Sequence, residues 1–208
     1  MKKLKALAVI IILLALAFLW FEWFYPGRMQ HLLFPLEYKD SIKKASKRYG
    51  LDPYVISAII YEESKFNPSS ESRHGAIGLM QVMPKTGKWV AAKQGRQFSV
   101  DDLYTPETNI DMGCFYYNYL LSKYGDERLA LAAYNSGFKN VDRWLRDRGY
   151  ASVDAVIENI PYEETRQFVQ RVQRTKTVYK RLYPGAFKEV ERKQNSGQLA
   201  DPNHSREK

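Results

Sequence analysis

The chain has 208 residues, 45% of them hydrophobic, and carries a formal net charge of +9 at pH 7. This length suggests one domain of about 100–200 residues with extensions, and the hydrophobic content is enough for a buried core. The basic balance suits an anionic surface, whereas no basic stripe carries a groove-reading motif, so we expect no nucleic-acid partner.

Residues 1–25 have the composition of a membrane-spanning segment. Lys2, Lys3 and Lys5 precede an uninterrupted apolar run, and the span 6–25 has about the 20 residues needed to cross a bilayer. Lysines on this side favour an orientation that leaves the rest of the chain outside the cytoplasm. The alternative is a cleaved signal sequence, but its apolar region would be long and no small-x-small site follows. We therefore predict a single-pass anchor in the cell membrane, with secretion after cleavage as the alternative, and a juxtamembrane linker at 26–36.

The remaining chain is predicted to form one all-α globular domain over 37–185, followed by a disordered polar tail over 186–208. A first helix should end at Gly50, and Asp52-Pro53 should cap and begin the next, which Asn67-Pro68 closes. An irregular loop follows over 69–83. Further helices are expected at 84–93, 106–124, 126–134, 138–148, 152–158 and 162–182. No convincing alternating strand pattern occurs in the sequence.

Cysteine and histidine usage favours no metal or cofactor. Cys114 is the single cysteine, so no internal disulfide can form, and its helical context suits a small core residue. His31, His74 and His204 are scattered and lack metal-ligand spacing. We therefore expect no metal ion and no cofactor.

Glu63 is the candidate catalytic residue. It ends an apolar run and precedes the Gly-punctuated loop, an environment that raises the pKa of a carboxyl and leaves a substrate access to it. It shares helical spacing with Ile56, Ile59 and Ile60. Glu62 lies near the other edge of the same broad stripe, and a glutamate at a helix end can also be a capping or solvated side chain, so the pattern alone does not decide.

Five motifs in order carry a family resemblance. They are Glu63-Ser64 with Asn67-Pro68; Gly75-Ala76 with Gly78-Leu79-Met80-Gln81, Met83-Pro84 and Thr86; Asn109-Ile110 with Gly113 and Tyr119-Leu120; Ala133-Tyr134-Asn135 with Gly137; and Ile160-Pro161-Tyr162 with Glu164-Thr165-Arg166 and Phe168-Val169. Together they resemble the soluble lytic transglycosylase (SLT) domain over about residues 50–182. The family has a goose-lysozyme-like, mainly helical fold that can carry a minor β element, and it cleaves bacterial peptidoglycan. Two positions depart from it: Glu62 is commonly Gln, and Ser136 is commonly Ala.

The resemblance implies chemistry with one carboxyl group, although glycoside cleavage usually uses two. Glu63 would protonate the oxygen of the β-1,4 bond between N-acetylmuramic acid (MurNAc) and N-acetylglucosamine (GlcNAc). It would then accept the proton of the MurNAc C6 hydroxyl, which closes a 1,6-anhydro ring, while the substrate's N-acetyl group assists at the anomeric carbon. Of the two candidates for a second carboxylate, we expect Glu62 to be a helix-surface charge, and we assign Glu164 no role in proton transfer.

The resemblance also implies a set of substrate contacts. Gln81 would read an N-acetyl group, Met80 would make an apolar contact or else belong to the core, and Ser72 would face the acid or the N-acetyl group. Tyr134 would place its hydroxyl beside Glu63 and donate to it, although a buried tyrosine with a local partner is the alternative. Asn135 would contact sugar, and Glu164 would line the cleft.

These expectations define a membrane-anchored lytic transglycosylase whose partners are peptidoglycan strands and, through the N-terminal helix, the membrane. Two alternatives stay open. A muramidase would deliver water in place of the C6 hydroxyl, and a non-catalytic module would only bind the wall as part of a scaffold.

Overall fold

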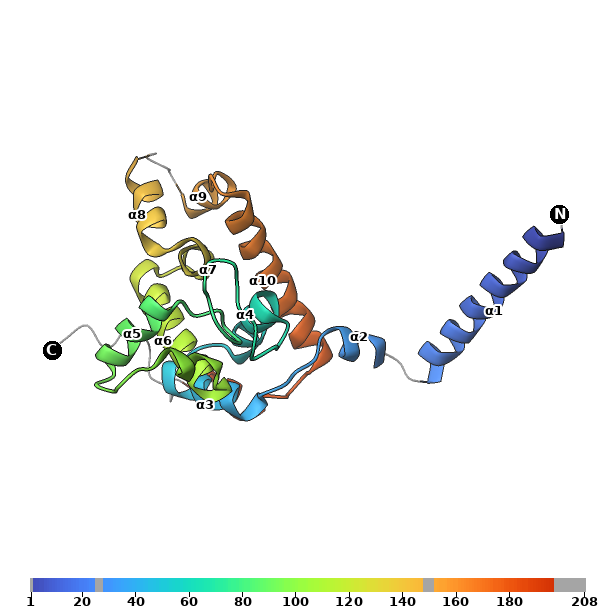
Figure 1. The fold of residues 1–208 in the computed structure, drawn as a ribbon, viewed down its shortest axis with the longest axis horizontal. Helices are drawn as coiled ribbons and strands as arrows, with labels where there is room; N and C mark the ends of the chain where they lie inside the picture. Colours follow the sequence, from blue (N-terminus) through green and yellow to red (C-terminus); the bar gives the residue numbers. More distant parts are fainter. Residues whose placement is uncertain (1, 25–27, 148–151, 197–208) are drawn as a thin grey trace. The chain divides into compact units, whose positions relative to one another are not determined.

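The computed structural model describes residues 2–24, 28–147 and 152–196, and this part of the chain is helical (Figure 1). It contains no strand in these ranges, only isolated bridges that pair Ile77 with Glu71 and Val82. The chain divides into two compact units, Met1–Leu36 and Glu37–Lys208. The first unit holds α1 (Lys2–Phe24) and α2 (Arg28–Leu33). The second holds α3 (Lys39–Tyr49), α4 (Pro53–Ser64), α5 (Pro84–Lys93), the 3-10 helix η1 (Val100–Tyr104), α6 (Pro106–Tyr124), α7 (Glu127–Ser136), α8 (Phe138–Asp147), α9 (Val153–Glu158), α10 (Glu163–Leu182) and α11 (Lys188–Asn195).

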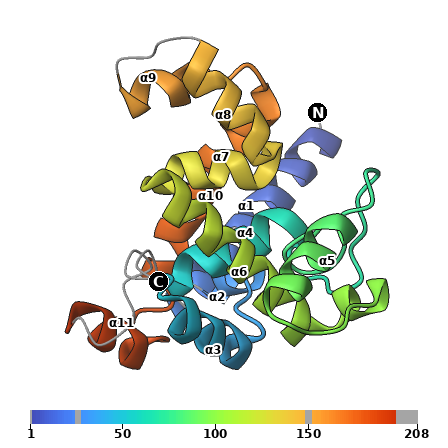
Figure 2. The same cartoon turned by 90° about the vertical axis from the view of Figure 1, so that its left-hand side faces the viewer.

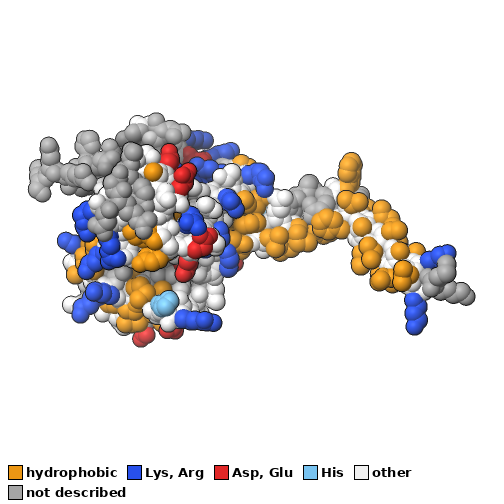
Figure 3. Space-filling model, turned by 90° about the horizontal axis from the view of Figure 1, so that it is seen from above, with side chains coloured by type: hydrophobic (Ala, Val, Ile, Leu, Met, Phe, Trp, Pro, Cys, Tyr) orange, Lys and Arg blue, Asp and Glu red, His pale blue; other side chains and the backbone are white. Residues whose placement is uncertain are grey.

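Helix α1 exposes its apolar side chains around its whole circumference, and basic side chains gather at its N-terminal end (Figure 3). Its segment Lys3–Phe21 is 19 residues long and has none of its residues buried within the protein. A helix of this length and composition can cross a bilayer. The segment expected to be a linker contains the short helix α2.

The second unit is built around α4, which lies at its centre (Figure 2). Residues 53–60 are all buried because α3 and α10 pack against this helix. Its start is as predicted: Asp52 caps it by accepting a hydrogen bond from the Tyr54 N–H at 2.9 Å, and Pro53 occupies the first turn. It ends earlier than predicted, because Lys65 turns into the left-handed region with φ 53°. Glu63 therefore lies in the last turn, next to the loop.

Two other helix starts and one stop follow the predicted chemistry. Prolines begin α5 at Pro84 and α6 at Pro106, where a missing N–H costs nothing. Gly125 ends α6 in the left-handed region with φ 67°, which glycine adopts without steric cost. Helix α6 packs against α3, α5 and α7. Residue 148, the expected end of the α8 helix, lies outside the described residues.

The expected disorder of the tail is wrong for residues 186–196, which include helix α11. Phe187 and Val190 are fully buried, and the Phe187 ring meets the Tyr54 ring edge-on at 5.3 Å between centroids. Gln194 Nε2 donates to the Leu51 carbonyl at 2.9 Å. Two apolar side chains three positions apart are thus enough to dock a short, otherwise polar helix. Residues 197–208 of the predicted tail lie outside the described residues.

Candidate active site

Glu63 is a partly accessible carboxyl at the end of the buried helix α4. Burial raises its pKa from 4.5 to about 8, because water no longer solvates the charged form. The positive charge of Arg171 opposes this rise in pKa, whereas the negative charges of Glu164 and Glu62 add to it. At neutral pH the side chain therefore holds a proton that it can donate.

Glu62 is not the surface charge that the sequence predicts, since its side chain is only 7% exposed. Its Oε1 accepts a hydrogen bond from Thr175 Oγ1 at 2.6 Å, and its Oε2 lies 3.2 Å from Arg171 Nε. Lys65 Nζ lies 3.5 Å from the same Oε2. The expectation fails because α10 packs along α4 and covers the face on which Glu62 lies.

Asn109 of α6 holds the loop over residues 69–83 in place. The residue is fully buried, its Oδ1 accepts from the Met80 N–H at 2.7 Å, and its Nδ2 donates to the carbonyls of Ile77 at 2.8 Å and Leu103 at 2.7 Å. Gly78 leaves room for this arrangement, because a Cβ there would lie 2.3 Å from Asn109 Nδ2. The sequence contains Asn109 within a family motif but gives no sign of this bridging role.

Ser64 fastens the end of α4 to the same loop. Its Oγ is buried, 2.8 Å from the Leu79 carbonyl oxygen and 3.0 Å from that of Ile60. Because Ser64 directly follows Glu63, this contact fixes the position of the carboxyl relative to the loop.

Tyr134 does not donate to Glu63, which corrects the predicted hydrogen bond. Its hydroxyl donates instead to the Met80 carbonyl at 2.7 Å, a buried acceptor that needs a donor. Burial, followed by the nearby charge of Glu63, raises the pKa of Tyr134 well above its usual value, so the hydroxyl stays protonated. The phenol oxygen still has a lone pair with which to accept a proton donor in the site.

Met80 belongs to the core, and this excludes its side chain from the predicted cleft wall. The residue is 0% exposed, and its sulfur lies 3.8 Å from Cys114 Sγ. Gly113 provides the space for it, because a Cβ at that position would lie 2.6 Å from the Met80 sulfur. Met80 therefore shapes the site through its backbone N–H and carbonyl.

Gln81 and Ser72 both organise the loop. Gln81 has φ 47°, and its Nε2 donates to the carbonyls of Gly78 at 2.9 Å and Ser70 at 3.1 Å, which leaves Oε1 as the acceptor for a ligand. Ser72 Oγ accepts from the Ala76 N–H at 3.0 Å and still carries a hydroxyl proton to donate. Their predicted contacts with substrate remain predictions.

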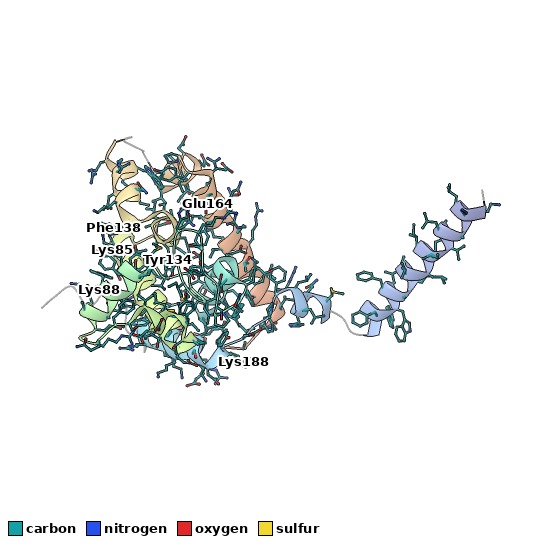
Figure 4. All side chains as sticks on the ribbon, in the orientation of Figure 1. Lys85, Lys88, Tyr134, Phe138, Glu164 and Lys188 are labelled. Carbon is teal, nitrogen blue, oxygen red and sulfur yellow. The ribbon has the colours of Figure 1, made fainter. Side chains whose placement is uncertain are left out.

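Three adjoining cavities, which we call the groove, run past Tyr134. The central one, of about 230 Å³, is lined by Gln81, Tyr134 and Asn135 among others. One neighbour, of about 540 Å³, has aromatic walls from Trp89, Tyr116, Tyr119 and Phe138, with Lys85 and Lys139 at its edge. The other, of about 490 Å³, is lined by His74, Asn135, Tyr162 and Glu164 among others. Ser136 lines all three, and Figure 4 shows Tyr134 between Phe138 and Lys85 on one side and Glu164 on the other.

Asn135 and Glu164 both line the groove, and their contacts with a ligand remain predictions. Asn135 Oδ1 accepts from Thr165 Oγ1 at 2.7 Å, which points to its amide N–H groups as the donors for a ligand. Glu164 is exposed in the first turn of α10 and acts electrostatically on Glu63. Within the described ranges, no three or more His, Cys, Asp or Glu side chains come together as a metal would require.

Glu63 lines none of these three cavities, but Tyr134 and Glu164, which do line them, both interact electrostatically with its carboxyl. The Transglycosylase SLT domain pattern covers residues 40–157, and the chain belongs to this family.

Among its relatives is the soluble lytic murein transglycosylase of Salmonella typhimurium, which is 37% identical over 147 residues, or 67% of this chain and 22% of the relative. The membrane-bound lytic murein transglycosylase C of Edwardsiella ictaluri is 36% identical, over 70% of this chain and 47% of the relative. The crystal structure of the 70 kDa soluble lytic transglycosylase of Escherichia coli superposes with a TM-score of 0.68 at 34% identity, covering 73% of this chain and 25% of that one. The chain thus spans about a quarter to a half of the length of these proteins.

Proposed function

We propose that this protein is a peptidoglycan lytic transglycosylase that cleaves the MurNAc–GlcNAc β-1,4 bond and leaves 1,6-anhydro-MurNAc. The observation that carries the proposal is the position of Glu63 in the last turn of the buried helix α4, where burial raises its pKa to about 8. A general acid works best when its pKa lies near the operating pH, because it must both hold and release the proton. A glutamate with an ordinary pKa would be ionised at neutral pH and could not begin the reaction.

The proposed reaction uses Glu63 twice. The protonated carboxyl gives its proton to the glycosidic oxygen as the bond from that oxygen to MurNAc C1 breaks, and the substrate's own N-acetyl oxygen supports the electron-poor C1. The Glu63 carboxylate then takes the proton of the C6 hydroxyl while the C6 oxygen bonds to C1. The enzyme regains its proton, and no water is consumed.

The neighbouring carboxylates support a mechanism with one acid. Glu62 is held by Thr175 and Arg171 and is largely covered, so it does not face the groove as a second base. Glu164 lies exposed in the first turn of α10, where it lines the groove. Burial raises the pKa of Glu63 to about 8, so Glu63 is the glutamate to which we assign the proton.

The groove supports a polymeric glycan as the substrate. The aromatic walls at one end can stack on sugar rings, and Gln81, Asn135 and Ser72 offer amide and hydroxyl groups for N-acetyl contacts. A 70 kDa soluble lytic transglycosylase similar to this chain has been crystallised with bulgecin A, which supports a ligand site. In the Pseudomonas aeruginosa lytic transglycosylase Slt a glutamate-to-glutamine mutant is inactive, which supports an essential glutamate.

We also infer that α1 anchors the protein in the cell membrane, with the domain on the wall side. The helix is long and apolar enough to cross a bilayer, and lysines lie in its first turn. Relatives named membrane-bound lytic murein transglycosylase C support this location. A signal sequence has a similar composition. Recovery of a mature chain that begins near residue 26 would show that the segment is cleaved and that the protein is secreted.

A comparison of Glu63→Gln with Glu127→Gln tests the assigned role of Glu63. Glutamine keeps the shape of the side chain but cannot exchange the proton, so cleavage of purified peptidoglycan should fall at least about 10²- to 10⁴-fold. Co-sedimentation with the peptidoglycan should persist. Glu127 lies outside the groove and pairs with Lys176, so its variant should keep wild-type turnover. Near-normal turnover in Glu63→Gln would refute the proposal, and a scaffold module would show binding without turnover in the wild type.

A further inference from the structure

We propose that Glu62 and Arg171 form a positioning pair that keeps Glu63 able both to give and to regain its proton. The inference rests on the proposed role of Glu63 as the single proton-transfer group. Glu62 is the adjacent residue on α4, and its carboxylate makes a 3.2 Å ion pair with Arg171 Nε.

Contacts from α10 hold the Glu62 carboxylate in place. Thr175 donates to Glu62 Oε1 at 2.6 Å, so one carboxylate oxygen is held by Thr175 and the other faces the guanidinium. Both partners come from α10, the helix that packs most extensively on α4. The Glu62 side chain is 7% exposed while Arg171 is 45% exposed, so the carboxylate is the fixed partner and the guanidinium stays accessible from solvent.

The effect on Glu63 follows from charge. An unopposed guanidinium close to a carboxyl stabilises the carboxylate and lowers its pKa, by about 1–3 units within 4–6 Å. Arg171 does act on Glu63 in this direction, whereas Glu62 acts in the opposite one. After Glu63 has donated its proton, the same Arg171 stabilises the carboxylate that results. Glu62 limits that stabilisation, so the carboxylate remains basic enough to take the C6 proton.

The other charged and titratable groups around the two glutamates do not replace this pair. Glu164 adds negative charge near Glu63, but it is exposed to solvent. Lys65 lies 3.5 Å from Glu62, with its side chain 57% exposed. Among the described residues, the groups that interact electrostatically with Glu62 or Glu63 come from three helices and one helix end. They are Tyr61 of α4, Lys65 just after the end of α4, Tyr134 of α7, and Glu164, Arg171 and Tyr179 of α10.

The test is the pH dependence of kcat/KM for the full-length protein on purified peptidoglycan. Loss of activity at high pH should follow deprotonation of Glu63. This fall in activity at high pH is the basic limb of the pH profile. Glu62→Gln should shift the basic limb to lower pH by about one unit, because the negative charge next to Glu63 is lost and Arg171 loses its ion-pair partner. At pH 8 a shift of that size lowers the protonated fraction, and hence the rate, about five-fold. Arg171→Gln should move the limb toward higher pH, and the double variant should lie between the two.

Glu127→Gln is the matched control, since it removes a carboxylate that pairs with another basic residue of α10, Lys176, at 2.7 Å. Its melting temperature can fall, but its pH profile should be that of the wild type. An unmoved basic limb in Glu62→Gln, with only a lower melting temperature, would make the pair structural and overturn the inference. If Glu62→Gln does not fold, Arg171→Gln decides in the same way. Activity in Glu63→Gln would instead overturn the proposed function itself.

Discussion

Replacing Asn109 by alanine should destabilise both the fold and the loop over residues 69–83. The substitution leaves two buried backbone groups without a partner, the Met80 N–H and the Leu103 carbonyl, whereas the Ile77 carbonyl keeps its bond from the Val82 N–H at 3.0 Å. An unsatisfied buried group costs about 1–3 kcal/mol, so two would cost about 2–6 kcal/mol if neither regained a partner. Water entering the vacated space recovers part of this free energy. We expect the free energy of unfolding to fall by about 3 kcal/mol, a large share of the roughly 5–15 kcal/mol that stabilises a domain.

Urea denaturation followed by circular dichroism measures this loss, and the cleavage rate should fall with it because the loop carries Gln81. Asn118→Ala is the control on the same helix, since Asn118 Oδ1 is buried without a hydrogen-bond partner among the described residues. It should cost less than about 1 kcal/mol. Equal losses in the two variants would refute the assignment of Asn109 as the bridge that holds the loop.

Three further predictions concern the acid, the groove and the C-terminal helix. Between pH 4.5 and about 8 the unfolded chain ionises Glu63 while the folded protein holds its proton, so wild-type stability should fall as pH rises. Urea titrations should therefore show Glu63→Gln gaining stability relative to wild type across this window; a constant difference would contradict the raised pKa. Tyr119→Ala removes a 39% exposed ring from the groove and should raise KM for long glycans about 3- to 10-fold with little change in kcat. An unchanged KM would place the glycan elsewhere. Phe187→Ala should destabilise the domain by about 3 kcal/mol in thermal unfolding. A loss under about 1 kcal/mol would show that α11 does not contribute to the cooperative unfolding of the domain.

The helix starts could be predicted from sequence because they depend on local chemistry. The Asp52 carboxylate reaches the Tyr54 N–H two residues away, and Pro84 and Pro106 fit a first helical turn wherever they occur. Glu63 as the candidate acid also followed from local pattern combined with the family motifs. The helices α2 and η1 were not expected, since short segments with few apolar residues give little periodic signal.

Hydrogen-bond partners and burial could not be predicted, because they depend on helices distant in sequence. Helix α4 is covered on nearly all sides, so the spacing of its apolar residues could not show that Glu62 faces Thr175 and Arg171. The Tyr134 hydroxyl bonds to Met80 rather than Glu63 because the loop turns a carbonyl toward it. Likewise, α11 docks through Phe187 and Val190 onto a surface that exists only once α3 and α4 have packed.

The most direct test of the central claim is the mass of the products that the full-length protein releases from peptidoglycan in water enriched in ¹⁸O. If the Glu63 carboxylate accepts the proton of the C6 hydroxyl and no water enters, the products end in 1,6-anhydro-MurNAc. Each is then one water lighter than a hydrolysis product and carries no ¹⁸O. Products that end in a reducing MurNAc labelled with ¹⁸O at C1 would show that water attacks that carbon, and the protein would be a muramidase.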